Sequence, residues 1–289
     1  MHLDEGKIAE AIVGKQVAAI EHDAERRAAR VPPPGETPLL EVRDLCSPGR
    51  LHPVSFSVAP GEVVGVAGLL GSGRSELLHA IYRSDRTASG VVILNGSEVA
   101  RGPGAAVRAG IGLVPEDRMA QGLVPEFEIW RNVSLPALDG VSLLNVMPVA
   151  ERERARGWEA IRRLAIKASS PEILVNELSG GNAQKVTIAK WLFSDVRLFL
   201  FDEPTAGIDI GAKAEILRLI RQLAGEGKSV VIVSSEFEEL LAVCDRILVL
   251  RDGRCVAERK VHDTNEHELL LLAGGQGGNT EVTPSAPLP

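Results

Sequence analysis

Short, strongly apolar runs recur along the chain and restrict its fold more than any other feature. They consist mainly of valine, leucine, isoleucine and phenylalanine, and they span residues 63–66, 91–94, 198–201 and 230–233. Runs this short suit strands that are buried on both faces. Amphipathic segments follow several of them, at residues 75–82, 212–224 and 236–243. This order predicts an α/β fold with a mostly parallel core sheet, in which ligands lie beyond the carboxyl ends of the strands.

Two smaller parts are expected beside the core sheet. Early strands near residues 39–42 and 55–58 are expected to be antiparallel and to form a β subdomain. The charged stretch 147–167 predicts helices outside the sheet, within a small helical subdomain at about residues 119–190. The whole domain is predicted to span residues 39–273.

A glycine-rich segment directly follows the run 63–66. It matches the phosphate-binding pattern GxxxxGK[ST] at every fixed position except the lysine, which Arg74 replaces. Glycines let the backbone aim successive N–H groups at phosphate oxygens, and the following helix adds its positive N-terminal end. For this motif alone, an accidental strand-to-helix turn is the alternative. The residues expected at a nucleotide are Gly68, Leu69, Leu70, Gly71, Ser72, Gly73, Arg74, Ser75 and Glu76.

Two carboxylates end the run 198–201. Asp202 stands where a P-loop fold places a magnesium ligand beside the phosphates, and Ser75 adds a hydroxyl for the same ion. Glu203 points differently and is the candidate general base for the water that attacks the γ-phosphate. In isolation, two solvated acids at a strand end would be an ordinary alternative. Their company with a P-loop favours ATP and Mg²⁺ as ligands.

A second anion-binding segment lies just upstream of this strand. Ser179, Gly180, Gly181 and Asn182 follow Leu178 and open a helical stretch. A serine hydroxyl and free N–H groups at a helix N-terminus bind anions, although a plain serine N-cap is the alternative. The segment resembles the LSGGQ signature of ABC ATPases, with asparagine in the last place. In that family the signature faces a nucleotide held by the opposite cassette, which implies a dimer of cassettes.

The resemblance covers about residues 39–273 and is nearest to the second, C-terminal cassette of tandem-cassette monosaccharide importers of the ribose, galactose and xylose type. The family's other hallmark stretches stand here at residues 115–118, with Gly122 and Leu123, and at residues 178–185 and 207–213. An arginine in the P-loop is typical of that second cassette. Ala183 departs from the family's LSGGNQQK and puts one contact in doubt. In the family's D-loop region, Asp209 is expected to help organise the dimer.

Four departures from an active cassette fall on the chain's own nucleotide site. Arg74 is bulkier than lysine and is not a conservative replacement at a tight phosphate site. Glu116 stands in place of the glutamine that senses magnesium, so it joins Ser75 and Asp202 as a magnesium-facing residue. Ser235 occupies the position of the switch histidine. Residues 40–55 contain no aromatic side chain to stack on adenine, and such stacking contributes about 1–3 kcal/mol in nucleic-acid complexes.

These departures predict a pair of cassettes whose two nucleotide sites are unequal in activity. The chain is expected to be an ATP hydrolase only with a partner cassette, whose P-loop and carboxylates would combine with this chain's signature. Further expected partners are an integral membrane permease and, indirectly, a periplasmic or lipoprotein sugar-binding protein. A non-hydrolysing regulatory cassette is the first alternative. A soluble ABC ATPase without a transport role ranks lower, because no long insertion or basic face supports it.

Composition and charge argue against several kinds of ligand and site. With 39 acidic and 32 basic residues the net charge is −7, which argues against nucleic acid as the main ligand. No uncharged apolar run is long enough to span a bilayer, so the chain is expected in the cytoplasm, peripheral on the inner face of the membrane. The three cysteines, Cys46, Cys244 and Cys255, show neither disulfide nor zinc-site spacing.

The two ends of the chain differ from the domain. Residues 1–38 are predicted to be the closing helix of a preceding cassette plus a proline-rich linker, with a simple N-terminal helix as the alternative. Residues 274–289 are rich in glycine, proline, serine and threonine and predict a disordered tail. A helix over residues 265–275 that ends in glycine echoes the N-terminal segment.

Overall fold

A six-stranded sheet forms the centre of the computed structural model, which describes residues 37–143 and 147–275. All strand pairs from β11 to β6 are parallel, and β12 joins β11 as an antiparallel edge strand. The mostly parallel core sheet is therefore confirmed. In sheet order the strands are β12 (Arg254–Lys260), β11 (Arg246–Arg251), β3 (Val63–Ala67), β10 (Ser229–Val233), β9 (Leu198–Asp202) and β6 (Ile111–Val114).

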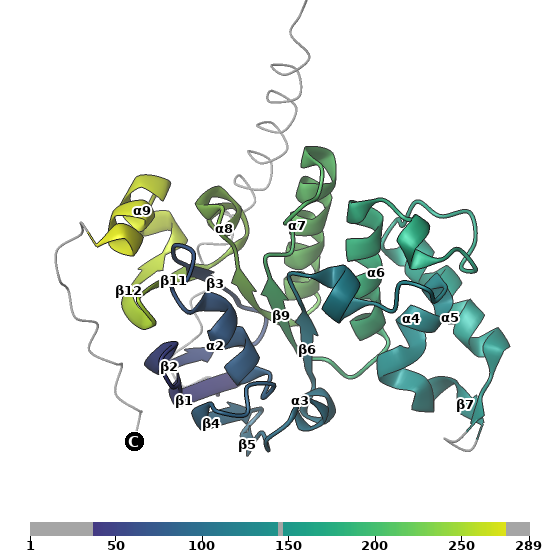
Figure 1. The fold of residues 1–289 in the computed structure, drawn as a ribbon, viewed down its shortest axis with the longest axis horizontal. Helices are drawn as coiled ribbons and strands as arrows, with labels where there is room; N and C mark the ends of the chain where they lie inside the picture. The colour runs from purple at the N-terminus through teal and green to yellow at the C-terminus, as the bar shows by residue number, and fades with distance from the viewer. Residues whose placement is uncertain (1–36, 144–146, 276–289) are drawn as a thin grey trace, which may run out of the picture.

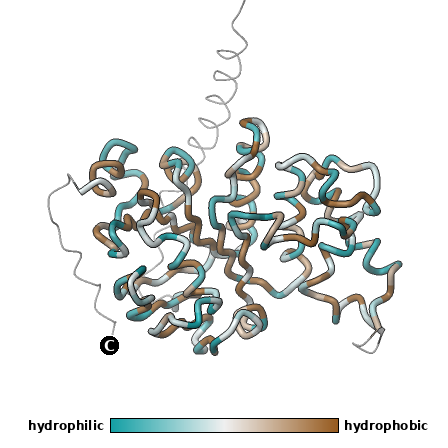
Figure 2. The backbone as a smooth tube through the Cα atoms, in the orientation of Figure 1, coloured by the Kyte–Doolittle hydropathy of each residue, from teal (hydrophilic) through white to brown (hydrophobic). Residues whose placement is uncertain are grey.

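The central strands are short and apolar because they are buried on both faces. Every residue of β3, β9 and β10 is buried, and Figure 2 shows apolar colour running through these strands. α2 (Arg74–Ile81) lies against one face and also contacts β1, whereas α7 (Ile210–Gly225) and α8 (Phe237–Val243) pack together and contact β10 and β3. Two apolar clusters result, one with α2 and one with α7 and α8.

A second sheet is antiparallel and confirms the expected β subdomain. Leu40 lies opposite Val58 in the pair formed by β1 and β2. The run 91–94 belongs to this sheet rather than to the parallel core, because β4 pairs antiparallel with β1. Its expected burial on both faces is therefore wrong: β4 alternates buried and partly exposed residues near its end. In sheet order the strands are β2 (Leu51–Val58), β1 (Leu40–Ser47), β4 (Ser89–Leu94) and β5 (Ser97–Glu98).

A helical region lies beside β6, at the right of Figure 1. It contains η1 (Arg118–Gly122), α4 (Ile129–Ser134), η2 (Leu135–Val141), α5 (Ala150–Arg163), η3 (Val175–Glu177) and α6 (Gly180–Leu192). α5 falls within the stretch expected to be helical. A two-stranded hairpin of β7 (Ser142–Leu143) and β8 (Met147–Pro148) was not predicted. α3 (Pro103–Ala109) precedes β6.

The C-terminal end of the described chain forms α9 (Glu266–Gly274). Asn265 caps it, and Gly275 ends it in the left-handed region with φ +82°. Both features agree with the helix expected over residues 265–275. The predictions for residues 1–36 and 276–289 lie outside the described residues. Among the helices of residues 37–143 and 147–275, none combines the length and apolar character needed to cross a membrane.

Candidate functional site

The glycine-rich loop forms a tight turn between β3 and α2. A Cβ on Gly68 would lie 2.3 Å from the Ser72 hydroxyl and 2.6 Å from the Leu250 carbonyl oxygen. Gly73 has φ +95°, and a Cβ there would lie 3.0 Å from the Arg50 carbonyl oxygen. Only glycine fits both the close approach and the positive φ. The chain thus folds this loop as the phosphate-binding pattern predicted.

Two polar side-chain atoms in this loop are buried without a hydrogen-bond partner among the described residues. They are the Ser72 hydroxyl oxygen and Nη1 of Arg74, whose residues are 5% and 7% exposed. Buried polar groups are nearly always satisfied, so such orphans call for a ligand or water. A phosphate group satisfies both, since its oxygens accept from a hydroxyl and a guanidinium. The loop therefore fits a nucleotide phosphate.

Asp202 ends β9 beside the first turn of α2. The Ser75 hydroxyl donates to its Oδ1 at 3.0 Å. Burial raises the pKa of Asp202 to about 6, the hydrogen bond from Ser75 opposes that shift, and the negative charges of Glu116 and Glu203 add to it. The described residues hold no cluster of three or more His, Cys, Asp or Glu side chains for a metal. Magnesium commonly takes one or two protein oxygens and completes its shell with phosphate and water, and Ser75 with Asp202 fits that role.

Both carboxylate oxygens of Glu203 interact with neighbouring residues, one through an ion pair and the other through hydrogen bonds. Its Oε1 lies 3.1 Å from Nη2 of Arg74, and both side chains are nearly buried. Its Oε2 accepts from the Ser235 backbone N–H at 2.9 Å and from the Ser235 hydroxyl at 3.1 Å. The backbone of Glu203 is left-handed, with φ +43°. Such strain is typical of functional positions that the surroundings fix. The P-loop arginine, the candidate base and the switch-position serine thus form one cluster.

Glu116 lies on the loop after β6 and is exposed. Its charge acts on Asp202, which places it in electrostatic range of the magnesium-facing pair. No side-chain hydrogen bond of Glu116 occurs among the described residues. The structure therefore brings Arg74, Ser75, Asp202, Glu203 and Ser235 together and leaves Glu116 at the rim.

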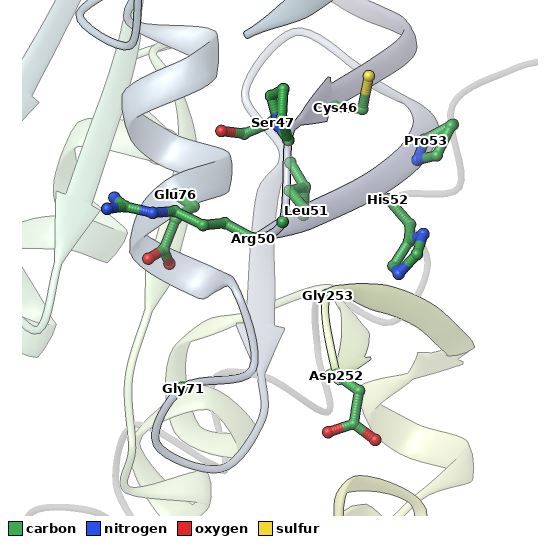
Figure 3. A pocket seen from close by; sticks show the side chains of 12 residues that line it. Cys46, Ser47, Arg50, Leu51, His52, Pro53, Gly71, Glu76, Asp252 and Gly253 are labelled. Carbon is green, nitrogen blue, oxygen red and sulfur yellow. The ribbon is translucent and has the colours of Figure 1, made fainter. Parts of the chain in front are cut away.

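A pocket adjoins the P-loop where residues 40–55 were expected to contact a base. Figure 3 shows Arg50 reaching over the first turn of α2, where Glu76 lies, and His52 near Asp252 on the opposite side. Gly71 and Gly253 also line this pocket. A guanidinium is planar and stacks on π systems, so Arg50 offers a flat surface although aromatic residues are missing. Sequence reasoning did not single out Arg50, because it searched this segment for aromatic side chains only.

The signature segment begins α6 in the helical region. Ser179 is the exposed N-cap residue, and its Oγ accepts from Asn182 Nδ2 at 2.8 Å rather than from the helix backbone. Asn182 Oδ1 in turn accepts from the Lys167 N–H at 2.8 Å. Within residues 37–143 and 147–275, the Ser179 hydroxyl proton and the first N–H groups of α6 have no acceptor and can meet an anion. Gly181 is buried, and a Cβ there would lie 2.5 Å from the Ala212 side chain.

The P-loop and the signature segment are separate sites in one chain. Across residues 37–143 and 147–275, no hydrogen bond or ion pair joins residues 68–76 to residues 178–182. Asp209 accepts from the Ala212 N–H at 3.0 Å as the N-cap of α7, and it is exposed. Its expected role in a dimer stays a prediction.

These loops and sheets define an ABC-type ATP-binding cassette of the P-loop class. The family model described as "ABC transporter" matches residues 51–206, which contain the P-loop, the signature and the acidic strand end. The chain belongs to this family.

Curated relatives and solved structures agree with this assignment. The chain is 42% identical over 273 residues to the arabinose import ATP-binding protein AraG 2 of Burkholderia cenocepacia, covering 94% of this chain and 52% of that protein. It is 39% identical over 284 residues to the ribose import ATP-binding protein RbsA of Chromobacterium violaceum, covering 98% and 55%. The chain thus spans about half the length of the curated relatives it matches. A dimeric ATP-binding cassette bound to ADP and Pi is 25% identical, with a TM-score of 0.66, and the match covers 77% of this chain and 98% of that one.

Proposed function

We propose that this chain is the ATP-binding half, or a separate ATP-binding subunit, of an ABC importer for a monosaccharide. Similarity to arabinose and ribose import proteins over nearly the whole chain supports the substrate class. A membrane permease, a sugar-binding protein outside the membrane and a position on the inner membrane face follow as parts of the same proposal. The family resemblance supports a second cassette as the direct partner, and the dimeric ADP-bound cassette shows such pairing in a similar protein.

We further propose that the chain's own nucleotide site hydrolyses ATP slowly. The observation that carries this is the ion pair between Arg74 and Glu203. A general base needs a free lone pair directed at the attacking water. Here one carboxylate oxygen of Glu203 faces a guanidinium and the other accepts two hydrogen bonds from Ser235. These contacts leave neither carboxylate oxygen of Glu203 free to accept a proton from the attacking water.

ATP hydrolysis transfers the γ-phosphoryl group to water and releases ADP and phosphate. In the chain's own site, the loop N–H groups, Ser72 and Arg74 would hold phosphate oxygens. Ser75 and Asp202 would hold Mg²⁺, with Glu116 at the rim. The ion, when bound, neutralises charge on the β- and γ-phosphates. In the partner's site, this chain would contribute the Ser179 hydroxyl and the N-terminus of α6, which stabilise phosphate charge from the opposite side.

The test compares two substitutions in this chain after mixing with its partner cassette. We expect Ser179→Ala to lower steady-state ATP turnover about 100-fold, the loss typical of removing one donor from a site of developing negative charge. Glu203→Gln is expected to change turnover by about two-fold or less, because the paired site uses the partner's carboxylate. If Glu203→Gln abolishes turnover and Ser179 is dispensable, the assignment is wrong.

The Arg74–Glu203 pair also favours one second candidate, a cassette that regulates by nucleotide occupancy alone. The same assay separates the two functions. A regulatory cassette would change the partner's turnover when ATP binds here, yet Ser179→Ala would leave the partner's maximal rate unchanged.

A further inference from the structure

Arg118 ends the hallmark stretch 115–118, and its side chain points toward the backbone of residues 206–207. Nη1 donates a 2.9 Å hydrogen bond to the Ala206 carbonyl oxygen. Nη2 donates a longer bond, 3.4 Å, to the Gly207 carbonyl oxygen. Nε is buried without a partner among the described residues. The guanidinium is therefore occupied by the backbone of the loop that joins Glu203 to α7.

The same guanidinium closes against the first residue of α6. A Cβ on Gly180 would lie 2.9 Å from Nη2 of Arg118 and 3.2 Å from the Gly207 carbonyl oxygen. The absence of a side chain at Gly180 leaves room for the signature helix, the loop and Arg118 to approach this closely. Three segments distant in sequence thus meet at one side chain: the turn after Glu116, the loop 206–209 and the start of α6.

The loop 206–209 is also held by Ile208, which is buried in the core and whose N–H donates to the Thr205 carbonyl oxygen at 3.3 Å. Its first N–H, that of Ala206, donates to the Glu203 carbonyl oxygen at 3.0 Å. Gly207 is exposed with φ +65°, and Asp209 is exposed at the other end. Among the described residues, the carbonyl oxygens of Ala206 and Gly207 accept hydrogen bonds from Arg118 alone. Charge-assisted hydrogen bonds are the stronger kind, and the planar fork of arginine reaches two carbonyls where lysine reaches one.

We propose that Arg118 is a positioning residue that fixes the loop 206–209 relative to the start of α6, and so shapes the surface that this chain presents to the partner's nucleotide. The consequence for catalysis rests on the proposed function. The structural claim stands on the contacts of Arg118 alone.

The structural claim is tested by amide hydrogen exchange on the isolated chain without nucleotide. In Arg118→Ala, exchange within residues 205–209 and 179–183 is expected to accelerate about ten-fold or more, while residues 66–78 keep their rates. Arg118→Lys should give an intermediate acceleration. Arg218→Ala is the matched control, because Arg218 is exposed on α7 and makes no hydrogen bond or ion pair among the described residues.

A second variant approaches the contact from its other side. Gly180→Ala places a methyl group against the guanidinium and should accelerate exchange in the loop 206–209, although the substitution lies in another segment. Unchanged exchange in both variants would overturn the proposal. An equal acceleration in every segment would do so too, since it would mean a loss of global stability only.

The catalytic consequence is measured as magnesium-ATP turnover of the chain mixed with its partner cassette. Arg118→Ala is expected to lower kcat about ten-fold, to leave the ATP affinity of the isolated chain within two-fold, and to be partly rescued by Arg118→Lys. Reduced ATP affinity with unchanged paired kcat would contradict a role at the partner-facing surface. If the unsubstituted chain gives no turnover on mixing, the proposed function fails, and the exchange experiment still decides the role of Arg118.

Discussion

The P-loop region and the signature region use the same elements, glycines and a serine at a helix N-terminus, in opposite settings. In the P-loop region, polar atoms of Ser72 and Arg74 are buried without partners in the part of the chain that the structure describes, and charged side chains neutralise one another. In the signature region, Ser179 is exposed and the side chain of Asn182 ties the segment to the Lys167 backbone. The first region holds buried polar atoms that a ligand would satisfy, whereas the second is an exposed surface that, under the proposed function, meets a nucleotide held by the partner cassette. Glycines and a serine at a helix N-terminus therefore occur in two different environments in one chain.

The largest expected effect on stability concerns Asp202. Because burial raises its folded pKa to about 6, the folded chain binds the proton more tightly than the unfolded chain. The free energy of unfolding should fall as pH rises from about 4 to about 6. Asp202→Asn removes this penalty and should stabilise the nucleotide-free chain above pH 6 by about 3 kcal/mol at most, from ~1.4 kcal/mol per pKa unit.

Urea unfolding in EDTA at pH 4 and pH 7.5 measures this difference. Asp209→Asn is the control from the other region, since asparagine caps a helix as well as aspartate and should change stability by about 0.5 kcal/mol or less. If both substitutions change the free energy of unfolding equally at pH 7.5, Asp202 does not carry a buried charge that Asp209 lacks.

Glycine substitutions should distinguish the P-loop region, which is expected to bind this chain's own ATP, from the signature region, which is expected to act on the partner's ATP. Gly181→Ala sets a methyl group against Ala212 on α7, and Gly73→Ala sets one against the Arg50 carbonyl oxygen. Each should cost about 1–3 kcal/mol of stability. Gly73→Ala is expected to weaken the chain's own ATP binding, and Gly181→Ala to lower turnover with the partner. Calorimetry measures ATP binding to the isolated chain, and the turnover of the mixed cassettes measures the effect on the partner. Gly225→Ala is the control, because an added Cβ there meets nothing within 4 Å.

A double substitution should make the P-loop region more active. Arg74→Lys with Ser235→His removes the guanidinium and the Ser235 hydroxyl from Glu203, keeps the backbone N–H bond of residue 235, and restores the residue types of active cassettes. We expect turnover at this site to rise about ten-fold, a part of the 100-fold or more that a general base supplies. The assay uses a partner whose own carboxylate is inactivated. An unchanged rate would mean that the cluster of Arg74, Glu203 and Ser235 does not limit hydrolysis.

The smallest effect concerns the pocket beside the P-loop. Arg50→Ala should weaken ATP binding about five-fold, because a flat cationic surface for the base is lost. Binding of inorganic tripolyphosphate should not change, since it lacks a base. Arg43→Ala, an exposed arginine paired with Glu41, is the control. Equal weakening of both ligands would place Arg50 at the phosphates instead.

Sequence patterns predicted the parts of the fold that depend on local signals. The glycine pattern placed the turn before α2, and the apolar runs placed β3, β9 and β10. The run 91–94 was assigned to the wrong sheet, because its composition equals that of a core strand and only pairing with β1 distinguishes it. The hairpin of β7 and β8 has too few residues to give a periodic signal.

Side-chain partners in the site could not be predicted in the same way. The sequence identified Arg74, Glu203 and Ser235 as departures or candidates, but their contact joins three segments far apart along the chain. The direction of Arg118 depends on the backbone of loop 206–209, which no pattern specifies. Positions set by periodicity are readable from sequence, while contacts between loops require the assembled sheet.

The most direct test of the unequal roles is the number of ATP molecules hydrolysed in one turnover of the paired cassettes. Rapid-quench analysis with ATP labelled on the γ-phosphate counts the phosphate released per pair in the first cycle. We predict one phosphate per pair, with the nucleotide on this chain's P-loop recovered as ATP. Two phosphates released at equal rates would contradict the account.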